Sequence, residues 1–155
     1  YFTESLPDES RGIYQIWILP NNDSGSVDII NEVTHFSKEF VRITRNLARN
    51  DYASLLSNCK FIIGNSSSGI LEAPSLGVVS INIGSRQTGR LRSQTVIDVP
   101  VASLDSINKA IDIIEDEPKT VYDKQYGDGD SSAKIVNVLN NLVIDGKLTN
   151  KFLVE

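Results

Sequence analysis

Two serines and a glutamate follow a short apolar run in the middle of the chain. Residues 61–63 lead into a polar loop that holds Ser66 and Ser67, and Glu72 follows six residues after Ser66. Backbone N–H groups of a Ser/Gly loop at a helix start can converge on an anion, which the helix dipole also favours. A carboxylate in the following turns can accept hydrogen bonds from a vicinal diol. Because a nucleoside diphosphate carries both phosphates and a ribose diol, this spacing favours such a ligand.

A purely structural interpretation of the same residues stays open. Ser66 or Ser67 alone can serve as a helix N-cap, and Glu72 as a favourable acid in the first turns. The next segment shifts the balance, because a second apolar run, residues 78–83, ends in a Gly-rich loop that carries Arg86 and Arg90. The guanidinium group is a planar fork that matches phosphate oxygens. Ligands of open α/β sheets bind where strands end, so the pair of loops predicts an anion site.

Asn21, His35 and Cys59 give less evidence of function than the two loops do. Asn21 follows Pro20 at the end of the first apolar run, where its amide can donate to a phosphate or sugar oxygen or can simply form a turn. His35 has no neighbouring metal-ligand spacing and is interpreted as a surface or packed residue. Cys59, the one cysteine, excludes an intrachain disulfide and is predicted to be buried and inert.

Apolar runs alternate with helix-like stretches along most of the chain, which predicts an α/β fold with a parallel sheet and helices on both faces. Leu104, Ile107, Ile111 and Ile114 recur at helical spacing and predict a core stripe. Asp130 or Ser131 is expected to cap the last helix. The predicted strands are residues 13–19, 40–44, 60–63, 78–83 and 95–99, and the predicted helices are residues 26–36, 51–57, 67–76, 103–116 and 131–143.

Composition excludes several classes of function. The net charge of −5 argues against a nucleic-acid surface, which needs clustered Lys and Arg. No apolar stretch has the length of a membrane span or a signal sequence, so we expect a cytoplasmic protein in which the sequons at Asn22 and Asn65 are unused. At 155 residues without a methionine, the chain is expected to be one domain from a longer protein.

Four motifs in order resemble the UDP-N-acetylglucosamine 2-epimerase family, in particular its hydrolysing type. They are LPNNDSGS at residues 19–26, GNSSSGILEAPSLG at 64–77, INIGSRQTGR at 81–90 and YGDG at 126–129. The resemblance extends from about residue 16 to residue 142. It implies a Rossmann-like domain that is one half of a two-domain, GT-B-like architecture. Residues 1–155 would then be a single nucleotide-sugar-binding domain, with the N-terminal domain absent.

The resemblance also implies roles for particular residues. Ser66 and Ser67 match serines that meet the diphosphate, Glu72 matches the acid that binds the ribose hydroxyls, and Arg86 matches the arginine of the following loop. Asn21 matches a substrate-facing asparagine. The resemblance also implies that the segment of Arg45, Asn46 and Leu47 lines the uracil side of the ligand. No metal or cofactor is expected, and the main acid and base groups are expected in the other domain.

The reaction implied by the resemblance converts UDP-N-acetylglucosamine to N-acetylmannosamine and UDP. A proton leaves C2 while UDP departs from C1, and water then adds to the unsaturated sugar. The NSSSG and GSRQ loops resemble the hydrolysing branch, whereas the other branch has aspartate-serine-glycine-glycine and threonine-glutamate-arginine loops. A GT-B glycosyltransferase and a non-catalytic binding module remain alternatives. The intact protein is expected to form a homo-oligomer, and residues 143–155 either cross toward the other domain or form a mobile terminus.

Overall fold

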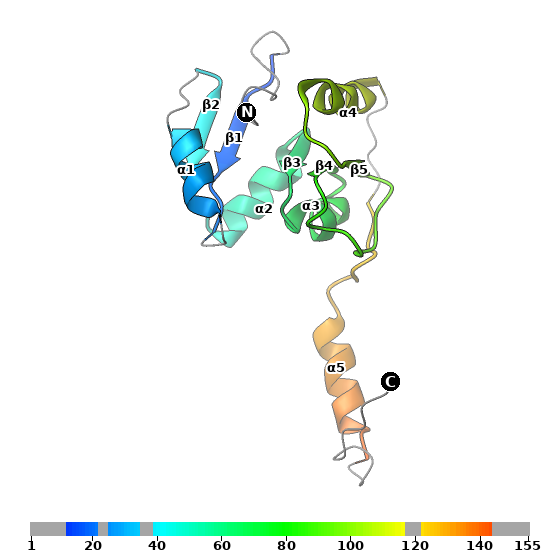
Figure 1. Cartoon of the computed structure of the whole chain (residues 1–155). Coiled ribbons are helices and arrows are strands. Elements are labelled where there is room, and N and C mark those ends of the chain that lie inside the picture. Colours follow the sequence, from blue (N-terminus) through cyan, green and yellow to red (C-terminus); the bar gives the residue numbers. More distant parts are fainter. Residues whose placement is uncertain (1–11, 22–24, 35–38, 117–121, 144–155) are drawn as a thin grey trace, which may run out of the picture. The chain divides into compact units, whose positions relative to one another are not determined.

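The computed structural model describes residues 12–21, 25–34, 39–116 and 122–143. The chain divides into two compact units, Tyr1–Gln125 and Tyr126–Glu155 (Figure 1), and each is described by itself. Strands and helices alternate as the sequence predicts, with ends that differ by a few residues. The elements are β1 (Gln15–Ile18), α1 (Ser26–Thr34), β2 (Val41–Thr44), α2 (Arg49–Asn58), β3 (Phe61–Gly64), α3 (Ser68–Leu71), the 3-10 helix η3 (Pro74–Leu76), β4 (Val79–Ile83), β5 (Val96–Val99), α4 (Leu104–Asp116) and α5 (Ser131–Asn140).

All strand pairs are parallel, which confirms the predicted α/β class. In the first unit β3, β4 and β5 form a three-stranded sheet in that order, and β1 pairs with β2. Phe61 lies opposite Val79, and Ser80 lies opposite Val96. Within the described ranges the strands therefore form two parallel groups rather than one continuous ladder.

Helix α4 packs on one face of the three-stranded sheet. Ile107, Ile111 and Ile114 are buried against Val79, Ile81 and other apolar residues of the strands. The predicted stripe is confirmed at these three isoleucines and is wrong at Leu104, the first residue of the helix, which is 53% exposed. Ala110, which was not part of the predicted stripe, is buried in the same core.

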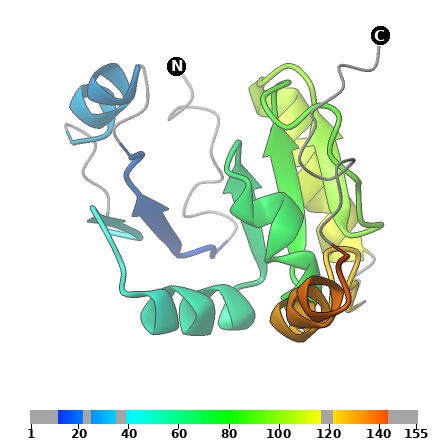
Figure 2. The same ribbon diagram turned by 90° about the horizontal axis from the view of Figure 1, so that it is seen from below.

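The opposite face of the same sheet meets α3. Successive strand side chains alternate between faces; accordingly Ile81 belongs to the α4 core, whereas Ser80 and Ile62 are the nearest neighbours of Gly69 in α3. Figure 1 shows the three strands between α4 and α3, and Figure 2 shows α3 in front of them. The expectation of helices on both faces is confirmed.

The predicted helix over residues 67–76 is two short helices, so that expectation is wrong in detail. α3 ends at Leu71, and η3 begins at Pro74. Proline has no N–H to continue an α-helical ladder, and the N–H of Ala73 reaches back to the Ser68 carbonyl at 3.0 Å. Gly77, with φ +72°, then reverses the chain into β4.

The second unit contains α5, which ends three residues before the predicted end. Asp130 occupies the N-cap position, but its carboxylate makes no capping hydrogen bond and instead pairs with Lys134 Nζ at 2.7 Å. This pair lowers the pKa of Asp130, mainly through the hydrogen bond from Lys134. His35, Asn22 and residues 144–155 lie outside the described residues, so the expectations for them are not tested.

None of the described helices has the length and apolar character that a membrane span requires.

Gly69 allows α3 to approach β4 closely. A Cβ at this position would collide with Ser80 Oγ but would lie 3.5 Å from Ser80 Cβ, and Ser80 is 2% exposed. We therefore expect Gly69→Ala to lower the free energy of unfolding by about 1–3 kcal/mol through overpacking, as measured by urea denaturation. Adding Ser80→Ala removes the clashing oxygen and should restore part of the loss. Additive effects in this double-mutant cycle would contradict the close contact.

Candidate functional site

The two loops singled out in the sequence leave the sheet at the same edge. Gly64 at the end of β3 pairs with Asn82, and Ile83 at the end of β4 pairs with Val99. Parallel strands place their carboxyl ends together, where ligands of open α/β sheets bind. The serine loop (residues 65–67) and the arginine loop (residues 84–90) are therefore neighbours, as predicted.

The serine loop presents two backbone N–H groups that donate to no described residue. Ser66 Oγ accepts a hydrogen bond from the N–H of Ser68 at 3.3 Å. This serine therefore satisfies one backbone donor at the start of α3, as a helix cap does. Ser67 occupies the N-cap position of α3 without a side-chain cap. Among the described residues, none accepts a hydrogen bond from the N–H groups of Ser66 and Ser67. These two groups are available to an anion.

Helix α3 does not provide the predicted helix dipole. α3 has four residues, and a macrodipole requires a longer run of aligned peptides. Any stabilisation of negative charge here comes from individual N–H groups and nearby arginines.

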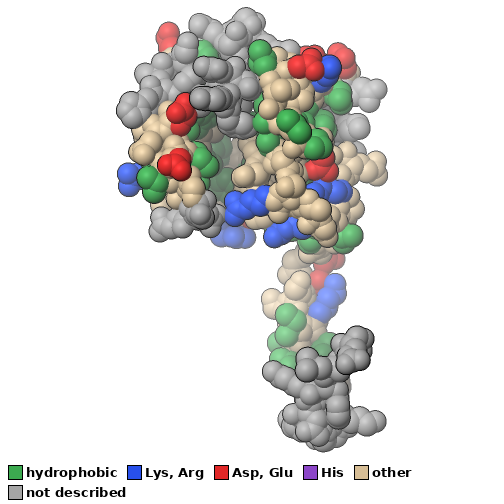
Figure 3. All heavy atoms as spheres, viewed as in Figure 1, with side chains coloured by type: hydrophobic (Ala, Val, Ile, Leu, Met, Phe, Trp, Pro, Cys, Tyr) green, Lys and Arg blue, Asp and Glu red, His purple; other side chains and the backbone are tan. Residues whose placement is uncertain are grey.

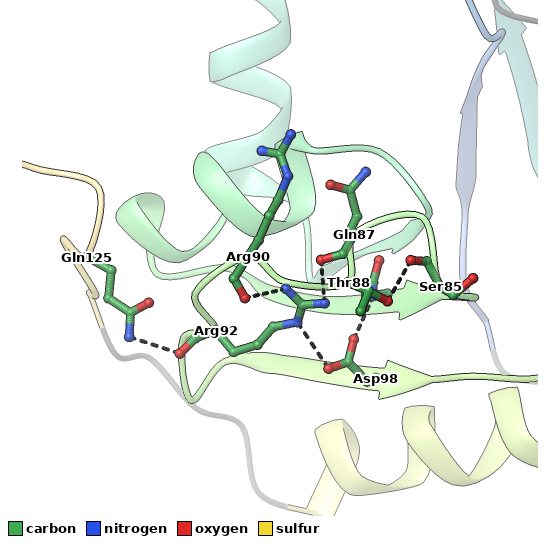
Figure 4. Close-up of polar contacts among 8 residues, drawn as sticks. Ser85, Gln87, Thr88, Arg90, Arg92, Asp98 and Gln125 are labelled. Carbon is green, nitrogen blue, oxygen red and sulfur yellow. Dashed lines mark hydrogen bonds and ion pairs between the residues drawn. The ribbon is translucent and has the colours of Figure 1, made fainter. Parts of the chain in front are cut away.

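Arg92 fixes the shape of the arginine loop. Its Nη2 donates to the Gln87 carbonyl at 2.8 Å, its Nη1 donates to the Arg90 carbonyl at 2.9 Å, and its Nε pairs with Asp98 Oδ2 at 3.1 Å. Asp98 Oδ1 accepts from Asn82 Nδ2 at 2.6 Å, which extends the network to β4. Figure 4 shows Arg92 between the loop and Asp98, whereas the side chains of Gln87 and Arg90 extend to the opposite side.

The buried side chain of Gln87 connects the two loops directly. Its Nε2 donates to the Asn65 carbonyl at 2.8 Å, and the residue is 4% exposed. This hydrogen bond joins residues 22 positions apart in the chain. It holds the arginine loop, which includes Arg86, next to the serine loop.

A pocket of about 270 Å³ lies between α2, η3 and the end of α3. It contains two of the predicted binding residues, Leu47 and Glu72. One face of α2 supplies residues at spacings of three and four, which is the period of a helix face. The full lining consists of Leu47, Arg49, Tyr52, Ala53, Leu56, Glu72 and Leu76.

Tyr52 ties α2 to α3 beside this pocket. Its hydroxyl is hydrogen-bonded to Ser68 Oγ. Burial raises the pKa of Tyr52 above its ordinary value, the charge of Glu72 adds to the rise, and the Ser68 hydrogen bond opposes it. The phenol therefore remains protonated at neutral pH.

Cys59 lies near the same α2 segment and differs slightly from its expected state. It is partly rather than fully buried, and its thiol donates to the Leu56 carbonyl at 3.1 Å. Burial raises the pKa of the Cys59 thiol, so the reactive thiolate is disfavoured, in line with the inert role predicted from the sequence.

The remaining predicted residues lie outside the pocket lining. Asn21, Arg45 and Asn46 are exposed residues that follow β1 and β2, and Arg86 is exposed on the arginine loop. Figure 3 shows Lys and Arg side chains gathered in the lower part of the first unit in this view, where Figure 1 places α2 and α3. The structure thus unites Leu47 with Glu72 and the serine loop with the arginine loop, but does not bring Asn21, Arg45 or Asn46 into the pocket.

Sequence reasoning missed Gln87, Arg92 and the pocket face of α2. The helical spacing of Arg49, Tyr52 and Leu56 was a usable signal for that face. Nothing local distinguished Gln87 or Arg92, since their partners are set by how the loops fold back. In the described parts of the chain, no cluster of three His, Cys, Asp or Glu residues suits a metal ion.

Comparison with known proteins gives the family. A sequence model of the UDP-N-acetylglucosamine 2-epimerase family matches residues 2–140. The chain belongs to this family. Among curated relatives, it is 37% identical over 138 residues to the UDP-N,N'-diacetylbacillosamine 2-epimerase (hydrolyzing) of Legionella pneumophila, covering 88% of this chain and 36% of that protein. It is 45% identical over 103 residues to the polysialic acid biosynthesis protein P7 of Escherichia coli, covering 66% and 26% of the two chains.

A further family relative is the UDP-N-acetylglucosamine 2-epimerase of Neisseria meningitidis, which is 32% identical over 139 residues, covering 86% of this chain and 36% of that protein. The structure of the UDP-GlcNAc 2-epimerase from Methanocaldococcus jannaschii matches with a TM-score of 0.58 and 17% identity, covering 90% of this chain and 48% of that one. This likeness supports the Rossmann-like fold. The chain spans about a quarter to a third of the length of these curated relatives.

The raised pKa of Tyr52 makes stability depend on alkaline pH. The unfolded chain ionises its tyrosines near pH 10, whereas folded Tyr52 holds its proton to higher pH. Folding stability from this site is therefore present below about pH 10 and is lost as the pH rises through the folded pKa. We expect Tyr52→Phe to show a smaller loss of unfolding free energy between about pH 9 and pH 11 than the wild type. Exposed Tyr126→Phe serves as the control, and identical pH profiles for all three proteins would contradict the assignment.

Proposed function

We propose that this chain is the UDP-binding half of a hydrolysing UDP-N-acetylglucosamine 2-epimerase, which converts UDP-N-acetylglucosamine to N-acetylmannosamine and UDP. The observation that carries the proposal is the placement of Glu72 and Leu47 in one pocket, close in sequence to a serine loop in which two N–H groups donate to none of the described residues. Family membership supports it, as do relatives named as hydrolysing 2-epimerases.

In this proposal the pocket holds the nucleoside. The apolar side chains of Leu47, Leu56 and Leu76 offer a surface for the flat uracil ring. Glu72, which is partly buried at the pocket wall, accepts hydrogen bonds from the ribose hydroxyls. Charge-assisted bonds of this kind are stronger than neutral ones. Asn21, Arg45 and Asn46 contact the substrate only from the rim.

The diphosphate extends from the pocket over the two loops. Departure of UDP from C1 places negative charge on the leaving phosphate oxygen, and the N–H groups of Ser66 and Ser67 together with the Arg86 guanidinium stabilise that charge. The C2 proton passes to a base as the C1–O bond breaks. Water then supplies a hydroxyl to C1 and a proton to C2. We propose that the base and acid belong to a second domain. Residues 1–155 alone should therefore not convert UDP-N-acetylglucosamine.

A second sugar nucleotide is also a candidate substrate. Two relatives, from Legionella pneumophila and Campylobacter jejuni, are named for UDP-N,N'-diacetylbacillosamine, at 37% and 39% identity. The described pocket contacts only the nucleotide in this proposal, so it does not discriminate between the two sugars. Family membership favours either epimerase over the glycosyltransferase alternative. We also propose that the intact protein is a homo-oligomer.

Replacement of Glu72 tests the nucleoside site. In the full natural polypeptide that carries these residues, Glu72→Gln should weaken UDP binding by about tenfold, because one charged acceptor for the diol is lost. Isothermal calorimetry measures the affinity. Glu115→Gln on α4, whose carboxylate pairs with Lys60 on the surface, is the matched control and should bind UDP as the wild type does. Wild-type affinity in Glu72→Gln would refute the pocket assignment.

Product analysis tests the reaction class. NMR of the full natural polypeptide with UDP-N-acetylglucosamine should show free N-acetylmannosamine and UDP. A parallel reaction with UDP-N,N'-diacetylbacillosamine compares the second sugar by kcat/KM. Accumulation of UDP-N-acetylmannosamine without free sugar would contradict hydrolysis, and no reaction with either substrate would favour a binding module.

A further inference from the structure

A buried carboxamide controls the direction of one peptide group in the serine loop. Gln87 Nε2 donates to the carbonyl oxygen of Asn65 at 2.8 Å. That carbonyl and the N–H of Ser66 belong to the same peptide unit, which is planar and trans. In a trans peptide the C=O and N–H bonds point in opposite directions. Holding the carbonyl on the Gln87 side therefore turns the Ser66 N–H away from Gln87, where it donates to no acceptor among the described residues.

We propose that Gln87 is a positioning residue for anion binding, which aims the Ser66 N–H at the phosphates through the Asn65 carbonyl. The identity of the anion, a nucleoside diphosphate, rests on the proposed function. Gln87 does not contact the ligand itself, because its side chain is buried beneath the loop. Its own backbone is held in turn by Arg92 Nη2, at 2.8 Å from the Gln87 carbonyl. Figure 4 shows this arrangement, with Arg92 and the Gln87 side chain on opposite sides of the loop backbone.

The second polar atom of the carboxamide makes it possible to test the positioning role without a large change in the free energy of unfolding. Gln87 Oε1 is buried and has no hydrogen-bond partner in the described parts of the chain. A buried acceptor without a partner costs free energy, which offsets the gain from the single hydrogen bond of Nε2. Methionine has a similar unbranched shape and no strong polar atoms. Gln87→Met should therefore leave the free energy of unfolding close to that of the wild type while releasing the Asn65 carbonyl.

The chain offers a matched control for this substitution. Gln125 Nε2 also donates to a backbone carbonyl, that of Arg92, at 2.9 Å, but the residue is exposed and does not touch the serine loop. The experiment compares the wild type, Gln87→Met and Gln125→Met in the full natural polypeptide. Calorimetry uses two probes, UDP and uridine, because uridine lacks the phosphates. We expect Gln87→Met to bind UDP about tenfold more weakly and uridine as the wild type does, and Gln125→Met to bind both normally.

Each outcome decides the proposal. Unchanged UDP affinity in Gln87→Met overturns it, and an equal loss of UDP and uridine affinity shows a general structural role instead. If the wild type binds neither probe, the proposed function fails separately. Amide hydrogen exchange without ligand still tests the inference in that case, because the N–H groups of Ser68 and Gly69 bond to Ser66. Faster exchange at both amides in Gln87→Met, but not in Gln125→Met, supports the positioning role, and unchanged exchange refutes it.

Discussion

The guanidinium group of Arg92 holds the arginine loop in one shape, and the candidate site depends on that restraint. Its three bonds reach two carbonyls of the loop and the carboxylate of Asp98 on β5. A loop fixed in this way can place the Gln87 side chain beneath the serine loop, where it meets Asn65. Arg92 therefore shapes the site through its bonds to other protein groups, whereas Arg86 lies exposed on the same loop.

The site is assembled from two kinds of contact with different physical origins. The pocket is walled mainly by apolar side chains of α2 and η3, which are positioned by the packing of Leu56 with Ala73 and Val78. The two loops, in contrast, are positioned by backbone-directed hydrogen bonds. Hydrogen bonds fix direction as well as distance, which suits groups that must converge on an anion, whereas apolar walls suit a flat ring.

Family membership and the structure support the proposed reaction at different levels. The match over residues 2–140 gives the family, and the parallel sheet with helices on both faces gives the Rossmann-like class. The described pocket contains one carboxylate, Glu72, whereas proton transfer at C2 and hydration require further acid and base groups. The nucleotide-binding role of these residues and the assignment of the sugar chemistry to a second domain are both proposals.

The sequence by itself determined the order of strands and helices, the family motifs and the meeting of two polar loops at one sheet edge. These features follow from the period of apolar residues and from parallel pairing, which local patterns encode. Tertiary structure alone decided that Leu104 is exposed and that Gln87 is hydrogen-bonded to Asn65. Such contacts depend on the path of each loop through space, because partners far apart in the chain meet only after the sheet has formed.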